Sequence, residues 1–257
     1  MLPESYSIIL ALAAATAAGL IGSFALMRRM TLAGDVISHV ALPGLGLAIL
    51  FDIYPLLGAA ASLFLGTLLI WQLERQTGLT VESMIGVVFA GSLAVGALLT
   101  TDEELVDALF GSFGALTIEE FAVGMFAALL VVLFILKYKD QLIIALFSPE
   151  LASSTGINLR RLNLYFLLTF SLTILLGLRF LGALLMGSLI IIPAAVGRQI
   201  THTLHNFLAA STLASVVSVA LGLFIISRYA LPADHLGPVV VTVTAALFAL
   251  SLLKKKQ

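Results

Sequence analysis

The chain alternates long apolar stretches with short polar ones. Nine stretches within its 257 residues contain no Asp, Glu, Lys or Arg. A helix rises about 1.5 Å per residue, so roughly 20 apolar residues cross the hydrocarbon core of a bilayer. Every backbone N–H and C=O in that core must be paired within the protein, and helices achieve this. The pattern therefore predicts an all-α, polytopic bundle of transmembrane helices. The nine stretches are residues 5–27, 36–51, 53–73, 83–101, 121–136, 162–178, 180–197, 199–227 and 235–253.

Two of these stretches are weaker candidates for a full crossing. Residues 36–51 are few and include His39, and residues 180–197 include Pro193. If either stretch entered and left the membrane on the same side, the chain would cross the bilayer eight times instead of nine. We therefore expect eight or nine spans, all within a single transmembrane domain that covers residues 1–257.

The composition fits a membrane protein and narrows its chemistry. Hydrophobic residues make up 61% of the chain and charged residues 11%, whereas soluble domains are about half apolar and a quarter charged. The absence of cysteine excludes disulfides and thiolate metal sites. The net charge of −1 arises from loops of opposite sign, so it indicates no nucleic-acid partner. Membrane lipid is the expected environment.

The basic residues distinguish the two sides of the membrane. Lys and Arg concentrate in the cytoplasmic loops of membrane proteins. Eleven of the thirteen lie in loops after odd-numbered stretches or in the carboxyl-terminal tail. The other two, Arg179 and Arg228, share the opposite side with the acidic cluster at residues 102–107. With nine spans, this asymmetry places the amino terminus outside the cell membrane and the carboxyl terminus in the cytoplasm.

The first polar motif inside an apolar stretch contains Asp35 and His39. The two are four residues apart, so on a helix their side chains share one face. A carboxylate beside an imidazole is a plausible half-site for a divalent metal such as Zn²⁺ or Mn²⁺. Ionisable groups at membrane depth usually face a bundle interior or a water path. A structural alternative is that Asp35 caps the second helix while His39 hydrogen-bonds a neighbouring one. Pro43 predicts a bend just after the pair.

The second motif lies between two apolar stretches, at residues 148–157. Ser148 is a good N-cap, Pro149 suits the first helical position, and Glu150 suits the positive end of a helix dipole. Gly156 can adopt the left-handed conformation that ends a helix. The motif predicts a two-turn helix that projects from the membrane domain. It either docks a cytoplasmic partner or merely joins two spans.

The remaining polar positions are weaker candidates. Pro193 lies within an apolar stretch and predicts a kink in that helix, with or without contact to a substrate. His202 and His205, near a cytoplasmic loop, and the pair Asp234 and His235, in an external turn, are interpreted as solvated loop residues. Glycines and alanines are frequent in the apolar stretches, which is typical of close packing between membrane helices.

Several catalytic motifs are absent from the sequence. It contains no Gly-x-x-x-x-Gly-Lys-Ser/Thr loop for ATP phosphates, no His-Glu-x-x-His zinc site and no Gly-x-Ser-x-Gly nucleophile pattern. We therefore expect the chain not to be an enzyme, and any use of ATP to take place in another subunit.

The motifs, in this order, resemble the membrane subunits of zinc- and manganese-type ABC importers. The resemblance extends over essentially the whole chain, and the ending at residues 251–257 is similar to the zinc-uptake branch. The matching segments are residues 28–30, 34–35, 38–39, 148–152, 182–195 and 251–257.

The resemblance implies a permease that imports a divalent metal. The expected metal is Zn²⁺, because the ending resembles the zinc-uptake branch, and manganese and iron are alternatives. The resemblance also implies a homodimer, two copies of an ATP-binding subunit that consumes ATP, and a periplasmic or lipid-anchored metal-binding protein. No permanent cofactor is implied. Asp35 and His39 would line the ion path, with Pro43 and Pro193 as helix kinks. The coupling helix that contacts the ATPase would comprise Ser148, Pro149, Glu150, Leu151, Ala152 and Gly156.

Two other classes of function remain open from the residues. A metal carrier or channel driven by gradients would need no ATPase partner. A membrane anchor for another protein is disfavoured by the polar residues within the predicted spans.

Overall fold

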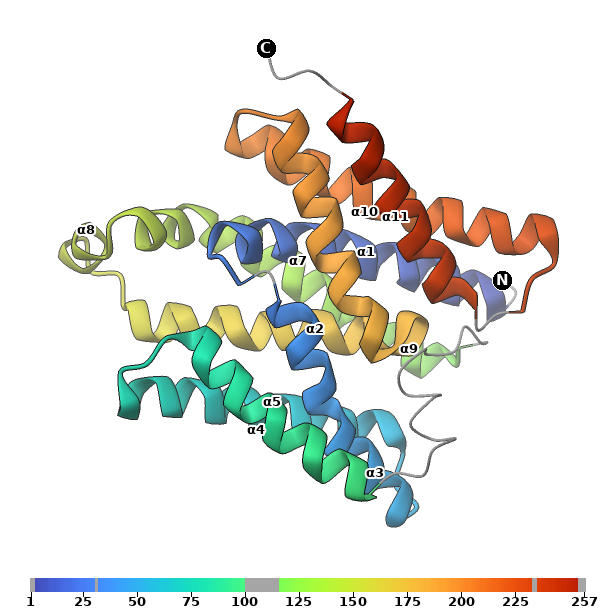
Figure 1. Cartoon of the computed structure of the whole chain (residues 1–257), viewed down its shortest axis with the longest axis horizontal. Helices are drawn as coiled ribbons and strands as arrows, with labels where there is room; N and C mark the ends of the chain where they lie inside the picture. The colour runs from blue at the N-terminus through green and yellow to red at the C-terminus, as the bar shows by residue number, and fades with distance from the viewer. Residues whose placement is uncertain (1–2, 31, 100–115, 233–234, 254–257) are drawn as a thin grey trace.

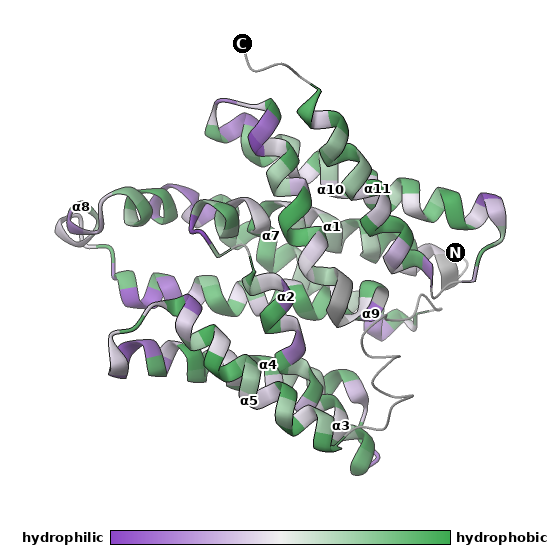
Figure 2. Cartoon of the chain, in the orientation of Figure 1, coloured by the Kyte–Doolittle hydropathy of each residue, from purple (hydrophilic) through white to green (hydrophobic). Residues whose placement is uncertain are grey.

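The computed structural model describes residues 3–30, 32–99, 116–232 and 235–253, and this part of the chain is helical without strands (Figure 1). The expected all-α bundle is confirmed. Figure 2 shows apolar residues along the lengths of the helices and polar residues mainly near their ends. The elements are α1 (Pro3–Met27), α2 (Ala33–Ser38), the 3₁₀ turn η1 (His39–Ala41), α3 (Leu42–Leu50), α4 (Pro55–Thr77), α5 (Val81–Leu99), α7 (Ile118–Phe147), α8 (Pro149–Ser154), α9 (Leu159–Ile200), α10 (Leu204–Tyr229) and α11 (Leu236–Leu252).

Seven helical segments of the described residues are long and apolar enough to cross a membrane. One of them, Ala33–Leu50, combines α2, η1 and α3, so the short second stretch is helical but interrupted. Two further apolar helices, Met186–Ile200 and Leu236–Leu252, are shorter. Each predicted stretch thus lies largely in a helix, and the number of crossings stays a prediction.

Helix α1 lies at the centre of the bundle, against α7, α9 and α10. Its small residues make this possible, because a run of alanines is buried and its glycines touch neighbouring backbones. A Cβ atom at Gly22 would lie 2.0 Å from the carbonyl oxygen of Ile190 in α9. Helices α4, α5 and α7 instead expose many of their leucines, valines and phenylalanines, as lipid-facing helices do.

Helix α9 is two helices joined without a loop. Gly182 has φ 72° and ψ 172° within the 42-residue element, a conformation that is essentially restricted to glycine. The two halves diverge sharply at this joint, and the second half crosses the bundle at an angle (Figure 1). The sequence drew attention to Pro193, but the non-helical residue within α9 is Gly182, eleven positions earlier.

The turn after α1 returns the chain into the bundle. The N–H of Arg29 donates to Leu26 O at 3.1 Å and that of Met30 donates to Ala25 O at 2.9 Å, the two bonds of a Schellman motif. Arg29 occupies the left-handed position, with φ 62°, where glycine is usual. Helix α2 then lies near the middle of the long axis, between α8 at one end and the amino terminus toward the other (Figure 1).

Helix α8 has the predicted local structure. The Oγ atom of Ser148 accepts a hydrogen bond from the N–H of Leu151 at 3.4 Å, and Pro149 is the first helical residue. Gly156 adopts φ 82° and ends the segment. The helix lies at the far edge of the molecule, beyond the ends of α7 and α9 (Figure 1). The predicted capped helix is confirmed, whereas its role as a coupling helix is a question of function.

Candidate functional site

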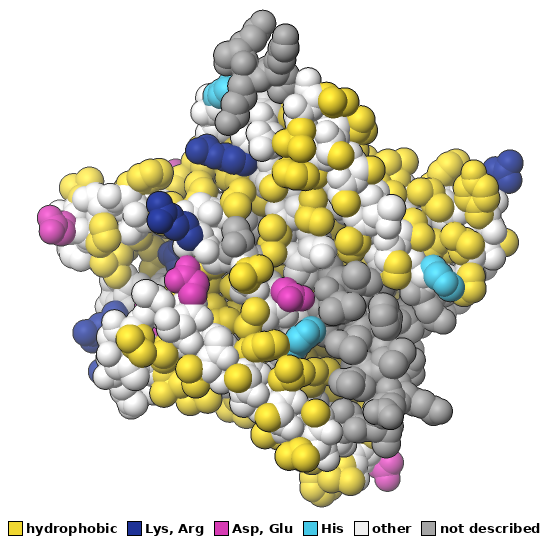
Figure 3. All heavy atoms as spheres, in the orientation of Figure 1, with side chains coloured by type: hydrophobic (Ala, Val, Ile, Leu, Met, Phe, Trp, Pro, Cys, Tyr) yellow, Lys and Arg dark blue, Asp and Glu magenta, His cyan; other side chains and the backbone are white. Residues whose placement is uncertain are grey.

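Asp35 and His39 lie at the centre of one face of the molecule. Asp35 is in α2 and His39 begins η1, and both side chains are half-buried. Figure 3 shows an acidic and a histidine side chain close together over α2. The hydroxyl of Ser38 donates to the backbone carbonyl of Asp35 at 2.6 Å, which ties the turn together between the two residues. The pair predicted from spacing is therefore brought together by the fold.

The imidazole of His39 is held by apolar contact. Its ring stacks on Phe89 of α5, with centroids 5.6 Å apart and planes inclined by 28°. Its Nδ1 atom is buried and has no hydrogen-bond partner among the described residues. Asp35 is near enough to act on the imidazole electrostatically. Because buried polar atoms are nearly always paired and neutral imidazole nitrogens bind metals, the donor set fits a passing divalent cation.

The structural alternative for the pair is not observed in the described residues. The N-cap position of α2 is Leu32, which makes no side-chain capping bond, and Asp35 lies within the first turn of the helix. His39 gives no hydrogen bond through Nδ1 to a neighbouring helix. Capping and inter-helix bonding therefore do not explain why Asp35 and His39 occupy an apolar segment.

The second half of α9 forms the wall behind Asp35. A Cβ atom at Gly187 would lie 2.5 Å from the backbone nitrogen of Asp35 and 2.7 Å from its Cα atom. A Cβ atom at Gly34 would lie 3.2 Å from the Cα atom of Gly187. The two backbones are thus in direct contact, and the absence of side chains at both glycines sets the position of the carboxylate.

The helix is interrupted next to His39. The 3₁₀ turn spans His39–Ala41, and Pro43 lies in the first turn of α3 immediately afterwards. The hydroxyl of Ser62 in α4 donates to the carbonyl of Val40, which satisfies backbone at the break. The interruption therefore lies within an apolar bundle, directly beside the Asp35–His39 pair.

Two ligands per chain are too few to trap a metal. No group of three or more His, Cys, Asp or Glu side chains that could hold an ion occurs among the described residues. Stable structural sites for zinc use four ligands. The pair is therefore suited to transient contact with an ion and not to permanent binding by one chain.

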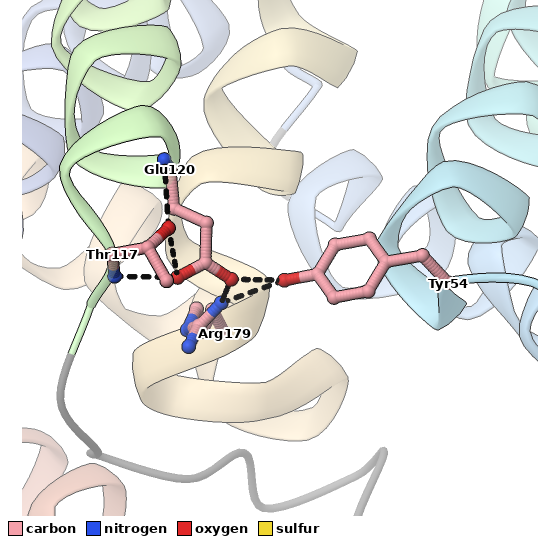
Figure 4. A network of polar contacts seen from close by, with 4 residues as sticks. All are labelled: Tyr54, Thr117, Glu120 and Arg179. Atoms are coloured by element: carbon pink, nitrogen blue, oxygen red, sulfur yellow. Dashed lines mark hydrogen bonds and ion pairs between the residues drawn. The ribbon is translucent and has the colours of Figure 1, made fainter.

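A polar network joins the starts of α4 and α7 to α9 (Figure 4). These helix starts lie at the end of the bundle opposite α8 (Figure 1). Nη1 of Arg179 lies 2.6 Å from Oε1 of Glu120 and 2.9 Å from the hydroxyl of Tyr54, which also donates to Glu120. Oε2 of Glu120 accepts the N–H of Thr117 at 2.8 Å and completes a capping box at the start of α7. We call these four residues the outer clasp. The sequence analysis placed Arg179 on one side of the membrane but gave no sign that it pairs with Glu120.

A second network lies at the α8 end. Nη1 of Arg28 donates to Oδ1 of Asn163 at 2.9 Å, and Nδ2 of Asn163 donates to Glu74 at 2.9 Å. The guanidinium of Arg28 also lies 4.2 Å from the ring centroid of Phe166. Burial lowers the pKa of Arg28 to about 10, against the opposing charge of Glu74, so the side chain remains a cation at neutral pH. Sequence reasoning missed Asn163, because a single amide in a helix gives no signal of its partners.

A cavity of about 520 Å³ adjoins this network and α8. Its walls come from the ends of α1, α4, α7 and α9 and from the start of α5, including Arg28, Glu74, Glu82, Pro149 and Asn163. Helix α8 is thereby linked through one cavity wall to the turn that precedes α2. The segment Leu159–Arg179 separates this end from the outer clasp by about 30 Å.

Comparison with known families identifies the family of the chain. The sequence model of the ABC 3 transport family matches residues 5–255. The chain belongs to this family. The resemblance to ABC importer membrane subunits is thus confirmed over nearly the full length.

Individual relatives of this ABC 3 family member carry metal-transport names. The chain is 30% identical over 243 residues to the high-affinity zinc uptake system membrane protein ZnuB of Haemophilus influenzae, with 92% of each chain covered. It is 28% identical over 210 residues to the manganese transport system membrane protein MntC of Listeria innocua, covering 80% of this chain and 75% of MntC. Its fold matches PsaBC of Streptococcus pneumoniae, solved in complex with Fab, with TM-score 0.81 and 25% identity, covering 96% of this chain and 90% of that one.

The other polar positions of this ABC 3 family chain lie away from the pair. His202 is exposed just before α10 and His235 is exposed just before α11, as predicted for solvated loop residues. His205 is also exposed, but it lies in the first turn of α10, so its prediction as a loop residue was wrong. Asp234 and the acidic cluster at residues 102–107 lie outside the described residues.

Proposed function

We propose that the chain is the permease subunit of an ABC importer that carries Zn²⁺ into the cytoplasm, driven by a separate ATP-binding subunit. The observation that carries the proposal is the Asp35–His39 pair, placed at a helix interruption with a buried Nδ1 atom that has no partner among the described residues. Family membership and the likeness to ZnuB support it.

Manganese is the second candidate cargo. MntC of Listeria innocua is nearly as similar as ZnuB. Carboxylate and imidazole serve both metals, because selectivity depends on geometry and on the number of each ligand type. One imidazole per carboxylate favours zinc over manganese, which prefers oxygen ligands.

The ion path is proposed to form between two copies of the chain. Each copy offers Asp35 and His39 on one face (Figure 3). A two-fold axis beside this face would bring a second identical pair opposite the first. Four ligands would replace part of the hydration shell of the ion only while the copies are close. Separation of the copies would return each to two ligands and release the metal.

Helix α8 is proposed to couple the permease to ATP hydrolysis. Leu151 is 53% exposed and Phe147, just before the helix, is 78% exposed, whereas Ala152 is fully buried against the bundle. An apolar protruding surface with a rigid cap suits a groove on another protein. The sequence lacks a phosphate-binding loop of its own. The α8 end would then face the cytoplasm, and the outer clasp would face an external metal-binding protein.

The path is tested by replacing its two ligands. We expect Asp35→Ala and His39→Ala each to reduce Zn²⁺ uptake at least tenfold in vesicles that hold the chain with its ATP-binding partner. Each change removes half of the ligands that one chain supplies, while α8 and its partner contact stay in place. Glu119→Ala, an exposed carboxylate change at the start of α7, is the matched control and should leave uptake unchanged.

Unchanged Zn²⁺ uptake by both Asp35→Ala and His39→Ala, at equal amounts of chain in the membrane, would remove the pair from the path. If the unmodified chain takes up Mn²⁺ but not Zn²⁺, manganese is favoured as the cargo instead.

A further inference from the structure

A second, smaller cavity lies directly beside α2 on its α8 side. It has a volume of about 220 Å³ and is lined by Arg29 of the α1–α2 turn, by Ala33 and Val36 of α2, and by Glu82 and Ile85 of α5. Ala33 and Val36 stand on either side of Asp35 in the sequence. The cavity therefore adjoins the helical turn that carries the proposed first ligand.

Glu82 also lines the larger cavity of about 520 Å³ beside α8. The two cavities thus meet at one carboxylate. Figure 3 shows acidic and basic side chains next to each other left of the centre, where the ends of α1 and α5 approach one another. Glu82, whose side chain is exposed, therefore lines both the space beside α2 and the space beside α8.

The opposite wall of the small cavity carries an arginine in a strained conformation. Arg29 has φ 62°, a left-handed conformation that glycine adopts more readily than a residue with a side chain. Its side chain lines the same cavity as Glu82, yet no ion pair joins the two within the described residues. Arg29 thus brings a positive charge to this space from a strained backbone position. It does not pair with the carboxylate of Glu82.

We propose that Glu82 is a second stop for the metal ion, between the Asp35–His39 pair and the cytoplasm, and that Arg29 keeps this stop weak. The inference rests on the proposed metal importer. A carboxylate oxygen is a ligand for Zn²⁺ and Mn²⁺ alike. A space of about 220 Å³ is large enough for water molecules beside an ion, so the ion can regain part of its hydration shell there. The guanidinium of Arg29 repels a cation at the same place, which favours release over retention.

The test is uptake kinetics of the permease reconstituted with its ATP-binding and external binding partners. Glu82→Gln is expected to lower the maximal rate of Zn²⁺ uptake about fivefold, without changing the external Zn²⁺ concentration at half-maximal rate. The reason is that Glu82 acts after the ion has passed Asp35 and His39. Glu119→Gln is the matched control, because it removes an exposed carboxylate from the first turn of another helix, and it should change neither quantity.

A purely structural role for Glu82 predicts a different result. Glu82 lies in the first turn of α5, where a negative charge interacts favourably with the helix dipole. Loss of that effect would lower thermal stability and leave the rate per folded molecule unchanged, which would overturn the proposal. Glu82→Asp keeps the charge and shortens the side chain. If Glu82→Gln does not reach the membrane, a lower maximal rate for Glu82→Asp supports the proposal and an unchanged rate overturns it.

The outcome for the exit stop is separable from that for the importer itself. Asp35→Ala with abolished uptake and Glu82→Gln with normal uptake would leave the proposed function standing and reject Glu82. Normal uptake by Asp35→Ala would reject the proposed path. Arg29→Gln is expected to slow release, seen as more Zn²⁺ retained per purified permease, and equal retention would contradict the role given to Arg29.

Discussion

At the residue scale, the candidate path depends on where backbones touch. Asp35 is fixed by the contact of α2 with Gly187 of α9, where the backbones of the two helices approach within van der Waals distance. Gly187 and Gly34 are therefore needed at this contact, because a side chain at either position would press against the neighbouring backbone. A sequence alone shows many glycines in apolar helices. Only the structure shows that Gly187 is the one that lies against Asp35.

Gly187→Ala is expected to impair uptake severely, because the added Cβ atom would lie 2.5 Å from the backbone nitrogen of Asp35. Such overlap between backbones costs on the order of 1–3 kcal/mol and displaces the carboxylate. Gly91→Ala is the control, since a Cβ atom there meets nothing within 4 Å. Uptake assays and thermal unfolding of both purified variants check this. Equal behaviour of the two would show that the contact is unimportant.

His39→Asp is expected to shift cargo preference from Zn²⁺ toward Mn²⁺. The change replaces the only imidazole of the pair with a carboxylate, and oxygen ligands suit Mn²⁺ better than nitrogen ligands do. We expect Zn²⁺ uptake to fall at least tenfold more than Mn²⁺ uptake, measured in competition. A uniform loss for both metals would show that His39 does not discriminate between them.

At the scale of elements, the sequence predicted which segments are helical but not how they are interrupted. The apolar runs, the N-cap at Ser148 and the left-handed Gly156 are local signals, and each was found. The joint within α9 is at Gly182, which the sequence did not predict, and the kink at Pro193 stays a prediction. A positive φ at glycine is selected by the packing of both halves, so no local pattern marks it.

The outer clasp is expected to stabilise the packing of α4, α7 and α9 against one another. Arg179→Gln removes the ion pair to Glu120, whose side chains are 26% and 24% exposed respectively. Screening by water limits the loss to about 1 kcal/mol. The apparent Tm of the purified chain should fall by a few degrees, while the exposed Arg228→Gln, in the last turn of α10, should leave it unchanged. An unaltered Tm for Arg179→Gln would show that the network adds no stability.

The clasp also predicts a dependence on high pH. Burial raises the pKa of Tyr54 above its usual value of about 10, assisted by the hydrogen bond to Glu120 and opposed by Arg179. The folded state therefore favours the neutral phenol, so its contribution is full below about pH 10 and is lost as the pH rises through the folded pKa. The difference in apparent Tm between the natural chain and Tyr54→Phe should shrink as the pH rises above about 10. A constant difference would contradict this.

At the scale of the whole molecule, the class of protein and the proximity of Asp35 and His39 could be predicted from the sequence, but the contacts between distant helices could not. Asp35 and His39 are four positions apart, and Ser148 through Gly156 are contiguous, so local spacing sufficed. The link of Arg28 to Asn163 joins residues 135 positions apart. The two cavities that meet at Glu82 also combine distant helices. Contacts of this kind follow from the packing of the bundle and have no local signature.

In the proposed importer, another subunit engages α8 and supplies the driving force. The alternative of a gradient-driven carrier shares the same helices, ligands and cavities. It differs in one respect, because it needs no ATP-binding partner. The two functions therefore diverge in the energy source and not in the appearance of the isolated chain.

The most direct test is ATP-dependent Zn²⁺ uptake by vesicles that hold the chain with and without its ATP-binding partner, with the external binding protein present in both. We predict uptake only when the partner and ATP are both present, and its loss when Leu151 in α8 is changed to Asp. Equal uptake without the partner or without ATP would contradict the importer and favour the gradient-driven carrier.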